Sequence, residues 1–423
     1  MPPTTPPVLV IQLARLGDLL QTRRLILSLA QYGDAGEPAP VHLLTDQSLT
    51  AFAEQAYPGV TVHGLPAHAG AVDPARVAGL CREALSGLAA HDFSHVYNIN
   101  HSPLSLALSA FFDPAQVVGH RLVRGQAHKD TVAAMALRWT KNRAQSAVNL
   151  MDYWAGFARM RISPRAVNPA ATPKGAGLGV AVSGRNARRS PPPEQLARIV
   201  AVLAASQGYS RITLFGTAAE AASARAVAKH LPASLLPGVR DLTGKTGLLD
   251  LAGEVGGLDA LLTPDTGLMH LAAGLGVPVT ALFLSSAWCH ETGPYGLGHT
   301  IWQAAPECAP CLEAKPCAHG LRCLAAFADP GFLRLMATGG RTPVPEGVIG
   351  YHGELDGLGA LCVPFAGRDP AEGVRARLRG LAGRFLGADE FFEAAAGPEA
   401  AAELFLETDY ILPERGAFPR REY

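Results

Sequence analysis

Two series of alternating strand-like and helix-like segments constrain the fold of this chain more than any other feature. The first series begins with a continuous apolar run at residues 8–13, suited to a strand buried on both faces, and has further strand-like segments at residues 41–44, 95–99 and 116–120. Segments with helical patterning follow these runs, at residues 19–31, 74–90, 103–112 and within 130–160. Strands that alternate with helices predict a parallel sheet with helices on both faces.

The pattern restarts after residues 162–179, a segment rich in Pro, Gly and Ala that we interpret as a linker. Further strands are expected at residues 180–183, 211–215, 258–262 and 277–283, and helices at 193–206, 217–230 and 267–275. The chain is therefore expected to be an α/β protein with two Rossmann-like domains, residues 1–165 and 175–330, whose strand ends face a central cleft. Residues 331–423 are expected to form a C-terminal extension of unassigned role, with a hairpin pattern at 348–365 and helical patterns at 371–387 and 388–407.

The composition excludes several functional classes. The chain has 423 residues, 48% of them hydrophobic, with 36 basic and 36 acidic residues, which argues against disorder and against a nucleic-acid partner. No apolar run is long enough to cross a bilayer, and the first seven residues lack signal-peptide features. We therefore expect a cytoplasmic protein and leave peripheral contact with the inner face of the membrane open. No G-x-G-x-x-G motif follows the first strand of either series, which disfavours a nicotinamide dehydrogenase.

A polar turn, Asp265-Thr266-Gly267, stands where the helix at 267–275 is expected to begin. An Asp in this position usually caps the helix by accepting a hydrogen bond from a backbone N–H group. The alternative is a phosphate site, because a glycine without Cβ lets an anion approach the N–H groups of Thr266, Gly267 and Leu268 at the positive end of the helix dipole. His270, one turn further, is either a further donor or a buried core residue. Position alone leaves both interpretations open.

Residues 242–283 (LTGKTGLLDLAGEVGGLDALLTPDTGLMHLAAGLGVPVTALF) closely resemble the donor-binding half of the lipopolysaccharide heptosyltransferases, glycosyltransferase family 9. Further similarity lies at residues 8–29, 183–199 and 292–296, so the resemblance spans most of residues 8–325. It implies a GT-B fold and an inverting transferase that moves a heptose or related sugar from an ADP-sugar to a lipopolysaccharide core or similar glycan. No cofactor is implied for this chemistry.

The resemblance also assigns roles to individual residues. Asp18, in the turn after the first strand, is implied to be the general base, although taken alone it would be read as a helix cap. Residues implied to hold the donor are Arg188, Arg189, Glu220, Asp265, Thr266, Gly267, Leu268 and His270. The two arginines would bring mobile positive charge to the diphosphate, or form a solvated basic loop; Glu220 would bond the ribose. Polar residues at a strand end, Asn98, Asn100 and His101, are candidates for the acceptor site or an ordinary polar loop.

Four of the seven cysteines, Cys308, Cys311, Cys317 and Cys323, fall within sixteen residues. Four thiolates can hold a structural zinc ion, but the spacing lacks the paired C-x-x-C form, so free or paired thiols remain the alternative. The sequence departs from the family where Leu284-Ser285-Ser286 replaces the usual Gly-Pro-Thr. This departure and the cysteine cluster keep open a non-catalytic sugar-nucleotide-binding protein. A sugar-nucleotide epimerase of the same fold is the other alternative.

Overall fold

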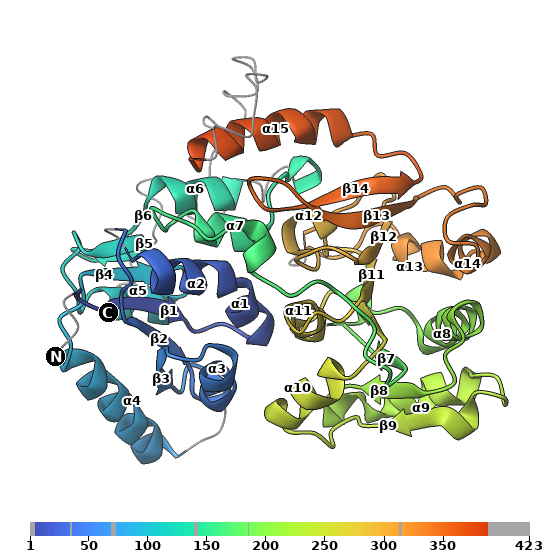
Figure 1. The fold of residues 1–423 in the computed structure, drawn as a ribbon, viewed down its shortest axis with the longest axis horizontal. Coiled ribbons are helices and arrows are strands. Elements are labelled where there is room, and N and C mark those ends of the chain that lie inside the picture. The colour runs from blue at the N-terminus through green and yellow to red at the C-terminus, as the bar shows by residue number, and fades with distance from the viewer. Residues whose placement is uncertain are drawn as a thin grey trace. The chain divides into compact units, whose positions relative to one another are not determined.

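The computed structural model describes residues 5–33, 36–68, 73–138, 143–184, 186–312 and 315–387 (Figure 1). The chain divides into two compact units. Unit 1 comprises Met1–Ser163 and Gly373–Tyr423, and unit 2 comprises Pro164–Glu372. The helical pattern expected at residues 388–407 lies outside the described residues.

The sheet of unit 1 has the strand order β3-β2-β1-β4-β5-β6. The strands are β1 (Val8–Gln12), β2 (Val41–Asp46), β3 (Thr61–Leu65), β4 (His95–Asn98), β5 (Val117–Val123) and β6 (Gln126–Lys129). The first five are parallel, and β6 turns back antiparallel to β5. All five residues of β1 are buried, as its apolar run predicts for a central strand. The strand at β3 escaped the sequence analysis because this edge strand is polar and partly exposed.

The helices of unit 1 are α1 (Leu16–Gln21), α2 (Arg23–Tyr32), α3 (Thr50–Ala56), α4 (Pro74–Ala89), α5 (Pro103–Ser109), α6 (Thr131–Arg138), α7 (Leu150–Ala155) and α15 (Glu372–Phe385). The single helix expected at residues 19–31 is divided at Thr22. Its hydroxyl donates to the carbonyl of Asp18 (2.9 Å) and accepts from Gln12 Nε2 (3.0 Å). This side chain therefore ties the helix break to the end of β1.

The sheet of unit 2 has the order β14-β13-β12-β11-β10-β7-β8-β9. Its strands are β7 (Leu178–Ala181), β8 (Ile212–Phe215), β9 (Val239–Asp241), β10 (Ala260–Pro264), β11 (Val279–Phe283), β12 (Thr300–Ala304), β13 (Val348–Leu355) and β14 (Ala360–Ala366). The strands from β9 to β12 are parallel, while β13 and β14 are antiparallel additions at one edge. Buried aliphatic residues of β7, β8 and α8 form its main core with aromatic side chains such as Trp302 and Phe332.

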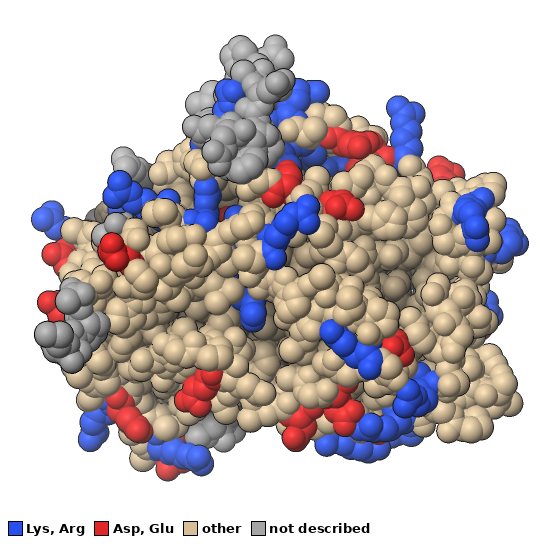
Figure 2. Space-filling model, viewed as in Figure 1, with Lys and Arg blue, Asp and Glu red and all other residues tan. Residues whose placement is uncertain are grey.

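The helices of unit 2 are α8 (Pro193–Gln207), α9 (Ala221–His230), α10 (Leu248–Gly256), α11 (Gly267–Gly274), α12 (Cys289–Thr292), α13 (Arg322–Ala325) and α14 (Pro330–Ala337). None of the described helices in either unit is both long enough and apolar enough to cross a membrane. On the face shown in Figure 2, basic side chains gather over α9 and β9, with acidic side chains beside them. One such pair joins Arg240 to Glu254.

The residues after 330 contribute to both units. The expected hairpin is present as β13 and β14, which extend the sheet of unit 2. The expected helix is present as α15, which packs on unit 1. There Arg379 Nη1 donates to the carbonyl of Ala147 (2.7 Å), and Arg375 donates to the carbonyl of Ala144. The part of this segment that the structure describes therefore does not form a separate domain.

Candidate active site

The carboxyl edge of the unit 2 sheet gathers most of the predicted donor residues. Its central strand β7 pairs with β8 on one side and β10 on the other, so the chain order reverses between β7 and β10. Ligands of open α/β sheets bind outside the carboxyl ends of the strands at such a reversal. Asp265 and Thr266 follow β10 there, and the turn Ala187–Arg189 comes after β7.

A buried ion pair joins these two segments. Arg189 Nη2 donates to the carboxylate of Asp265, and the two side chains are 12% and 7% exposed. The hydroxyl of Thr292, on α12, donates to the same carboxylate oxygen (3.1 Å). Asp265 therefore does not cap α11, which excludes the ordinary interpretation of this residue. Arg189 is held in place, in contrast to the mobile charge expected, and Thr292 was missed because nothing in its local sequence indicates this partner.

The N-terminus of α11 is capped by neither acid nor hydroxyl. Its N-cap residue is Thr266, whose side chain makes no capping hydrogen bond to the helix. Thr266, Gly267 and Leu268 are partly exposed, while the residues on both sides of them are buried. His270, the fourth helical residue, is 6% exposed. The start of α11 therefore offers its first N–H groups at the surface and keeps His270 inside.

Glu220 connects the ends of two strands at the same edge. Its carboxylate accepts from the hydroxyl of Ser183, after β7, and from the backbone N–H of Thr217, after β8 (2.6 Å). Gly216, between them, is closely packed, because a Cβ would lie 3.0 Å from both Glu220 Oε2 and Val182 Cγ2. The partly buried acid is thus positioned by local packing, and Ser183 is a partner that the sequence did not indicate.

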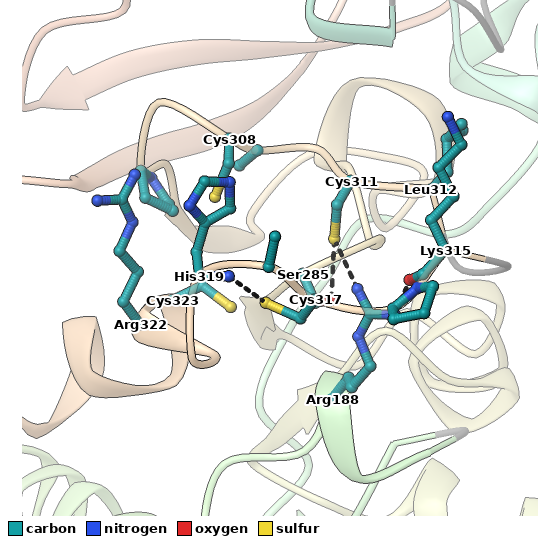
Figure 3. Close-up of a pocket in the computed structure, with 14 residues that line it drawn as sticks. Arg188, Ser285, Cys308, Cys311, Leu312, Lys315, Cys317, His319, Arg322 and Cys323 are labelled. Carbon is teal, nitrogen blue, oxygen red and sulfur yellow. Dashed lines mark hydrogen bonds between the residues drawn. The ribbon is translucent and has the colours of Figure 1, made fainter.

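A cavity of about 180 Å³ lies beside the arginine turn and is lined by all four clustered cysteines, Cys308, Cys311, Cys317 and Cys323 (Figure 3). Arg188 also lines this cavity. Its Nη2 donates to Cys311 Sγ (3.2 Å), and its Nη1 donates to the carbonyl of Lys315 (2.6 Å). Ser285 contacts the same sulfur through its hydroxyl (3.1 Å). Direct hydrogen bonds therefore connect the cysteine loop to the turn that carries Arg188 and Arg189.

The four thiols differ in their electrostatic surroundings. Backbone N–H groups of His319 and then Leu321 point at Cys317 Sγ and lower its pKa, assisted by the charges of Arg188 and Arg322. Burial raises the pKa of Cys323. Among the described residues, these four cysteines do not supply three sulfurs within 4.8 Å of one another, so they do not yet form a coordination sphere.

Ser285 stands in a backbone conformation that favours glycine. Its φ is 58°, in the left-handed region, and the residue is 2% exposed. Its carbonyl accepts from the backbone N–H of Cys311 (3.2 Å), in addition to the contact between hydroxyl and sulfur. Ser285 is therefore held in a strained conformation by the cysteine loop, and Leu284 beside it is buried at 1% exposure.

In unit 1, Asp18 lies on the exposed first turn of α1. Its Oδ2 accepts from the backbone N–H of Arg15 (3.2 Å), so the carboxylate does act at the helix start, and it remains in contact with solvent. Gln12, the last residue of β1, also holds this turn, because its Nε2 donates to the Asp18 carbonyl (3.3 Å). Asn100 Nδ2 donates to Gln12 Oε1 (2.7 Å) and Asn100 Oδ1 accepts from the backbone N–H of Leu13 (2.6 Å). The end of β4 therefore holds the end of β1.

Asn98 is a correction to the predicted acceptor site. The side chain is fully buried, and both hydrogens of its amide nitrogen donate within the unit, to the carbonyls of Ser105 (3.1 Å) and His120 (2.8 Å). Its oxygen accepts from the backbone N–H of Asn100 (3.2 Å). No hydrogen of this amide nitrogen is left for a ligand. Asn98 therefore serves the packing of β4 against α5 and β5.

His101 remains a surface side chain near this edge. Partial burial and, to a lesser degree, the charge of Lys129 lower its pKa, so its neutral form is favoured. The ring of His120 lies 5.6 Å away, and burial lowers the pKa of that residue to about 3. A neutral His101 can donate or accept one hydrogen bond at each ring nitrogen, as a sugar hydroxyl requires.

Comparisons with known proteins point to one group. Residues 192–320 match the sequence profile of glycosyltransferase family 9 (heptosyltransferase). A stretch of 78 residues is 35% identical to lipooligosaccharide heptosyltransferase 2 of Haemophilus influenzae, covering 18% of this chain and 22% of that protein. The similarity to this curated relative thus spans well under two thirds of its length.

The fold resembles that of solved family members over most of their length. A glycosyltransferase of family 9 from Veillonella parvula has a TM-score of 0.55 at 16% identity, covering 73% of this chain and 89% of that one. The E. coli heptosyltransferase WaaC with ADP has a TM-score of 0.53 at 18% identity, covering 71% and 93%. E. coli ADP-heptose LPS heptosyltransferase II has a TM-score of 0.51 at 15% identity, covering 70% and 89%. At these identities the likeness establishes the fold, and the expected GT-B class is confirmed.

Proposed function

We propose, from the membership of residues 192–320 in glycosyltransferase family 9, that this protein is an inverting glycosyltransferase with an ADP-heptose or related donor. In this proposal unit 2 binds the donor and unit 1 binds the acceptor, a lipopolysaccharide core or similar glycan. The nucleotide is the one with which the related E. coli enzyme WaaC was solved. The proposal places the reaction in the cytoplasm, at the inner face of the membrane that carries such an acceptor.

The observation that carries the proposal is the start of α11. Thr266, Gly267 and Leu268 present N–H groups that no side chain of the N-cap residue occupies. The helix dipole adds positive potential beside them, and the guanidinium of Arg189, paired with Asp265, lies at the same turn. Such preorganised donors stabilise the charge that grows on a leaving diphosphate, and loss of one donor of this kind costs about 100- to 1,000-fold in rate.

The remaining donor residues have supporting roles. Arg188, held by Cys311 and the Lys315 carbonyl, fixes the turn that carries Arg189. Glu220 is placed at the strand edge to accept hydrogen bonds from a ribose hydroxyl. Asp265 orients Arg189, and His270 is buried in the first turn of α11.

Unit 1 supplies the base in this proposal. A hydroxyl of the acceptor attacks the anomeric carbon while its proton passes to the carboxylate of Asp18. The bond between the anomeric carbon and the β-phosphate oxygen breaks, and the electron pair leaves with ADP. A single displacement of this kind inverts the anomeric centre. Asn100 and His101 are proposed to bond acceptor hydroxyls; Asn98 is not.

No cofactor takes part in the proposed chemistry, because the helix start and Arg189 neutralise the leaving group. We propose a structural role for the cysteine cavity. Its four thiols would hold a zinc ion if their side chains turned inward, and this would fix the loop that contacts Arg188 and Ser285.

The test replaces the base while keeping its shape. Asp18→Asn is expected to lower kcat by at least about 100-fold, the range of general base catalysis, with little change in ADP affinity. Asp73→Asn is a matched control, since Asp73 is another exposed Asp of unit 1 that accepts a hydrogen bond at a helix start. Full turnover in Asp18→Asn would remove this residue from the mechanism.

A donor panel tests the reaction class. Transfer of heptose from ADP-heptose to a lipopolysaccharide core, with release of ADP, is the expected result. Release of a reducing sugar without acceptor would favour the epimerase. Binding of nucleotide without turnover over a broad panel of donors and acceptors would favour a binding protein.

A further inference from the structure

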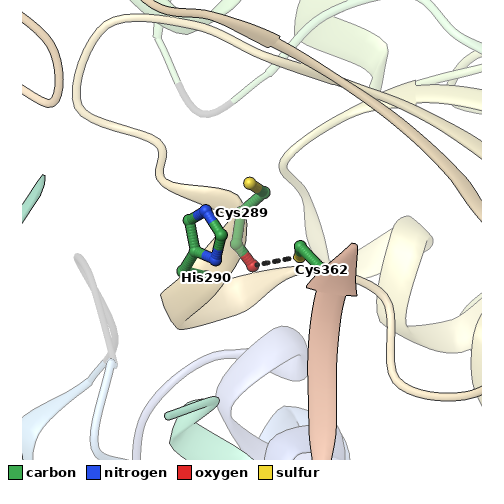
Figure 4. Close-up of side chains that lie close together, drawn as sticks. All are labelled: Cys289, His290 and Cys362. Atoms are coloured by element: carbon green, nitrogen blue, oxygen red, sulfur yellow. Dashed lines mark hydrogen bonds between the residues drawn. The ribbon is translucent and has the colours of Figure 1, made fainter. Parts of the chain in front are cut away.

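A second group of metal-binding side chains lies in unit 2, apart from the four clustered cysteines. Cys289 and His290 begin α12, and Cys362 belongs to β14 (Figure 4). One ligand atom from each residue, two sulfurs and an imidazole nitrogen, all lie within 4.8 Å of one another. This is the one such group of three among the residues that the structure describes. A tetrahedral zinc ion separates its ligand atoms by roughly 3.5–3.8 Å, so a small rotation of these side chains would close the site.

The surroundings of His290 match those of a metal-binding imidazole. Its Nε2 lies 3.8 Å from Asp369 Oδ2, and both side chains are less than 10% exposed, at 8% and 4%. Tyr351 donates its hydroxyl to the same carboxylate oxygen (2.9 Å). A carboxylate that faces one nitrogen of an imidazole orients the ring and makes the other nitrogen a better ligand. Asp369 is therefore placed beside the His290 ring, where it can orient the imidazole.

The backbone is shaped to bring the two cysteines together. Cys362 Sγ contacts the carbonyl of Cys289 (3.6 Å), and Gly293 closes α12 with its N–H on that carbonyl (2.8 Å). A Cβ at Gly293 would lie 2.5 Å from the Cys289 carbonyl oxygen and 3.6 Å from Cys362 Sγ. Only a glycine permits this approach. The rings of Trp288 and Tyr351 lie 5.5 Å and 5.1 Å from the His290 ring and limit access of water.

Packing alone is the simpler explanation for a buried cysteine, since free cysteines often behave as small apolar residues. It does not account for an imidazole nitrogen that lies within 4.8 Å of both sulfurs and beside a buried carboxylate. Sulfur and imidazole ligands select zinc over hard cations such as magnesium and calcium.

We propose that Cys289, His290 and Cys362 bind one zinc ion, with Asp369 as a positioning residue and with a fourth position for water or a small ligand. Binding releases the two thiol protons as the zinc–sulfur bonds form. The ion joins α12 to β14. Because Thr292 of α12 donates to Asp265, the zinc ion also fixes the segment that holds the donor-binding turn; this consequence alone rests on the proposed function.

The experiment separates this site from the cysteine cavity. The background protein carries Ser in place of Cys308, Cys311, Cys317 and Cys323, and zinc is measured by mass spectrometry and by release to a chromogenic chelator. We expect one zinc ion per chain in the background and none after Cys362→Ser is added. Asp369→Asn, which keeps all three ligands, is expected to weaken zinc affinity about 10- to 100-fold. Cys81→Ser, in unit 1, is the control and should retain the ion.

A measurement on the unaltered chain does not depend on whether the variants fold. Zinc should protect Cys289 and Cys362 from alkylation, as mapped by peptide mass spectrometry, and a chelator should expose them. A folded background protein without zinc, an unchanged zinc content in Cys362→Ser, or equal alkylation with and without chelator would each overturn the proposal. Loss of zinc with unchanged ADP affinity would keep the metal site and remove its link to the donor turn.

Discussion

The two units share a strand order but use its carboxyl edge in different ways. In unit 1 the central strand β1 lies between β2 and β4, and in unit 2 the central strand β7 lies between β8 and β10. In unit 1 the neutral amides of Gln12 and Asn100 hydrogen-bond to each other between the ends of β1 and β4, and the carboxylate of Asp18 remains exposed. In unit 2 the corresponding place has an ion pair and an open helix start.

This difference matches the two tasks of the transferase that we propose. A base needs one carboxylate on a rigid support, whereas a diphosphate needs several donors and positive charge. The same topology therefore supplies either chemistry, depending on which side chains follow the central strands.

Within this comparison, the largest effect on ADP affinity is expected when the ion pair at the carboxyl edge of unit 2 is removed. Arg189→Ala should weaken ADP binding by about 10- to 100-fold, since a hydrogen bond from a charged group contributes about 1.5–3 kcal/mol and Asp265 is left unpaired. Isothermal titration calorimetry measures this. Arg189→Ala combined with Asp265→Asn should recover part of the affinity. Arg198→Ala, at an exposed pair with Glu194, is the control and should leave affinity unchanged.

Substitution of a buried amide in unit 1 is expected to change the free energy of unfolding and not the affinity for ADP. Asn98→Ala leaves two buried carbonyls without their donors and should lower the free energy of unfolding by about 1–3 kcal/mol, measured by urea denaturation. ADP affinity should not change. In unit 2, Asn168→Ala removes the amide that donates to the carbonyl of Tyr295 (2.8 Å), and this substitution should lower the free energy of unfolding less. An equal or larger loss in unit 2 would contradict this ranking.

Acid should loosen unit 1 before unit 2. Burial and then the charges of His91 and His63 lower the pKa of His42 to about 4, and its Nδ1 lies 2.9 Å from His63 Nε2. Above pH 6.5 His42 is neutral in both the folded and the unfolded chain, so its lowered pKa does not change the free energy of unfolding. As the pH falls from 6.5 toward about 4, the unfolded chain binds a proton before the folded protein does, and the free energy of unfolding decreases.

The matching group in unit 2 is His299, whose burial lowers its pKa to about 4 without a second histidine among the causes. Between pH 6.5 and about 5 we expect unit 1 to lose on the order of 1–2 kcal/mol from its histidine cluster. Hydrogen exchange should show β2 and β3 opening before β11 and β12. His42→Gln should reduce the difference but not abolish it, because burial also lowers the pKa values of His63 and His120 in unit 1. Simultaneous opening of both units would argue against this ranking.

The smallest effects come from two hydroxyls that hold the turns. Thr292→Val removes the hydrogen bond to Asp265 and should weaken ADP binding only about 2- to 10-fold, since such a bond contributes about 0.5–1.5 kcal/mol. Thr22→Val removes the hydrogen bond to the Asp18 carbonyl in unit 1 and should lower kcat with ADP affinity unchanged. Steady-state kinetics and titration distinguish the two; a shared effect on affinity would contradict the division of tasks.

Much of this fold could be predicted from local patterns. The apolar run at residues 8–13 became β1, the segment at 267–275 became α11, and the hairpin at 348–365 became β13 and β14. The polar edge strand β3 and the short β9 were missed, because few buried residues leave little periodicity in the sequence.

The candidate site was less predictable. The DTG turn was found by its resemblance, but the partner of Asp265 was not, since Arg189 lies 76 residues away. Asn98 and Asn100 stand two residues apart with identical chemistry, and only the tertiary structure shows that Asn98 is fully buried and Asn100 partly exposed. Cys289, His290 and Cys362 come from segments 73 residues apart, so no spacing rule could have joined them.

The sequence by itself determined where most strands and helices form and which segment resembles a nucleotide-sugar site. It could do so because the spacing of apolar residues along a short segment reports its secondary structure and its buried face. The tertiary structure alone decided which carboxylate is paired and which is exposed, which amides are consumed in packing, and which thiols meet. Those outcomes depend on contacts between residues far apart in the chain, and the free energy of each contact exists only once the sheet edges have assembled.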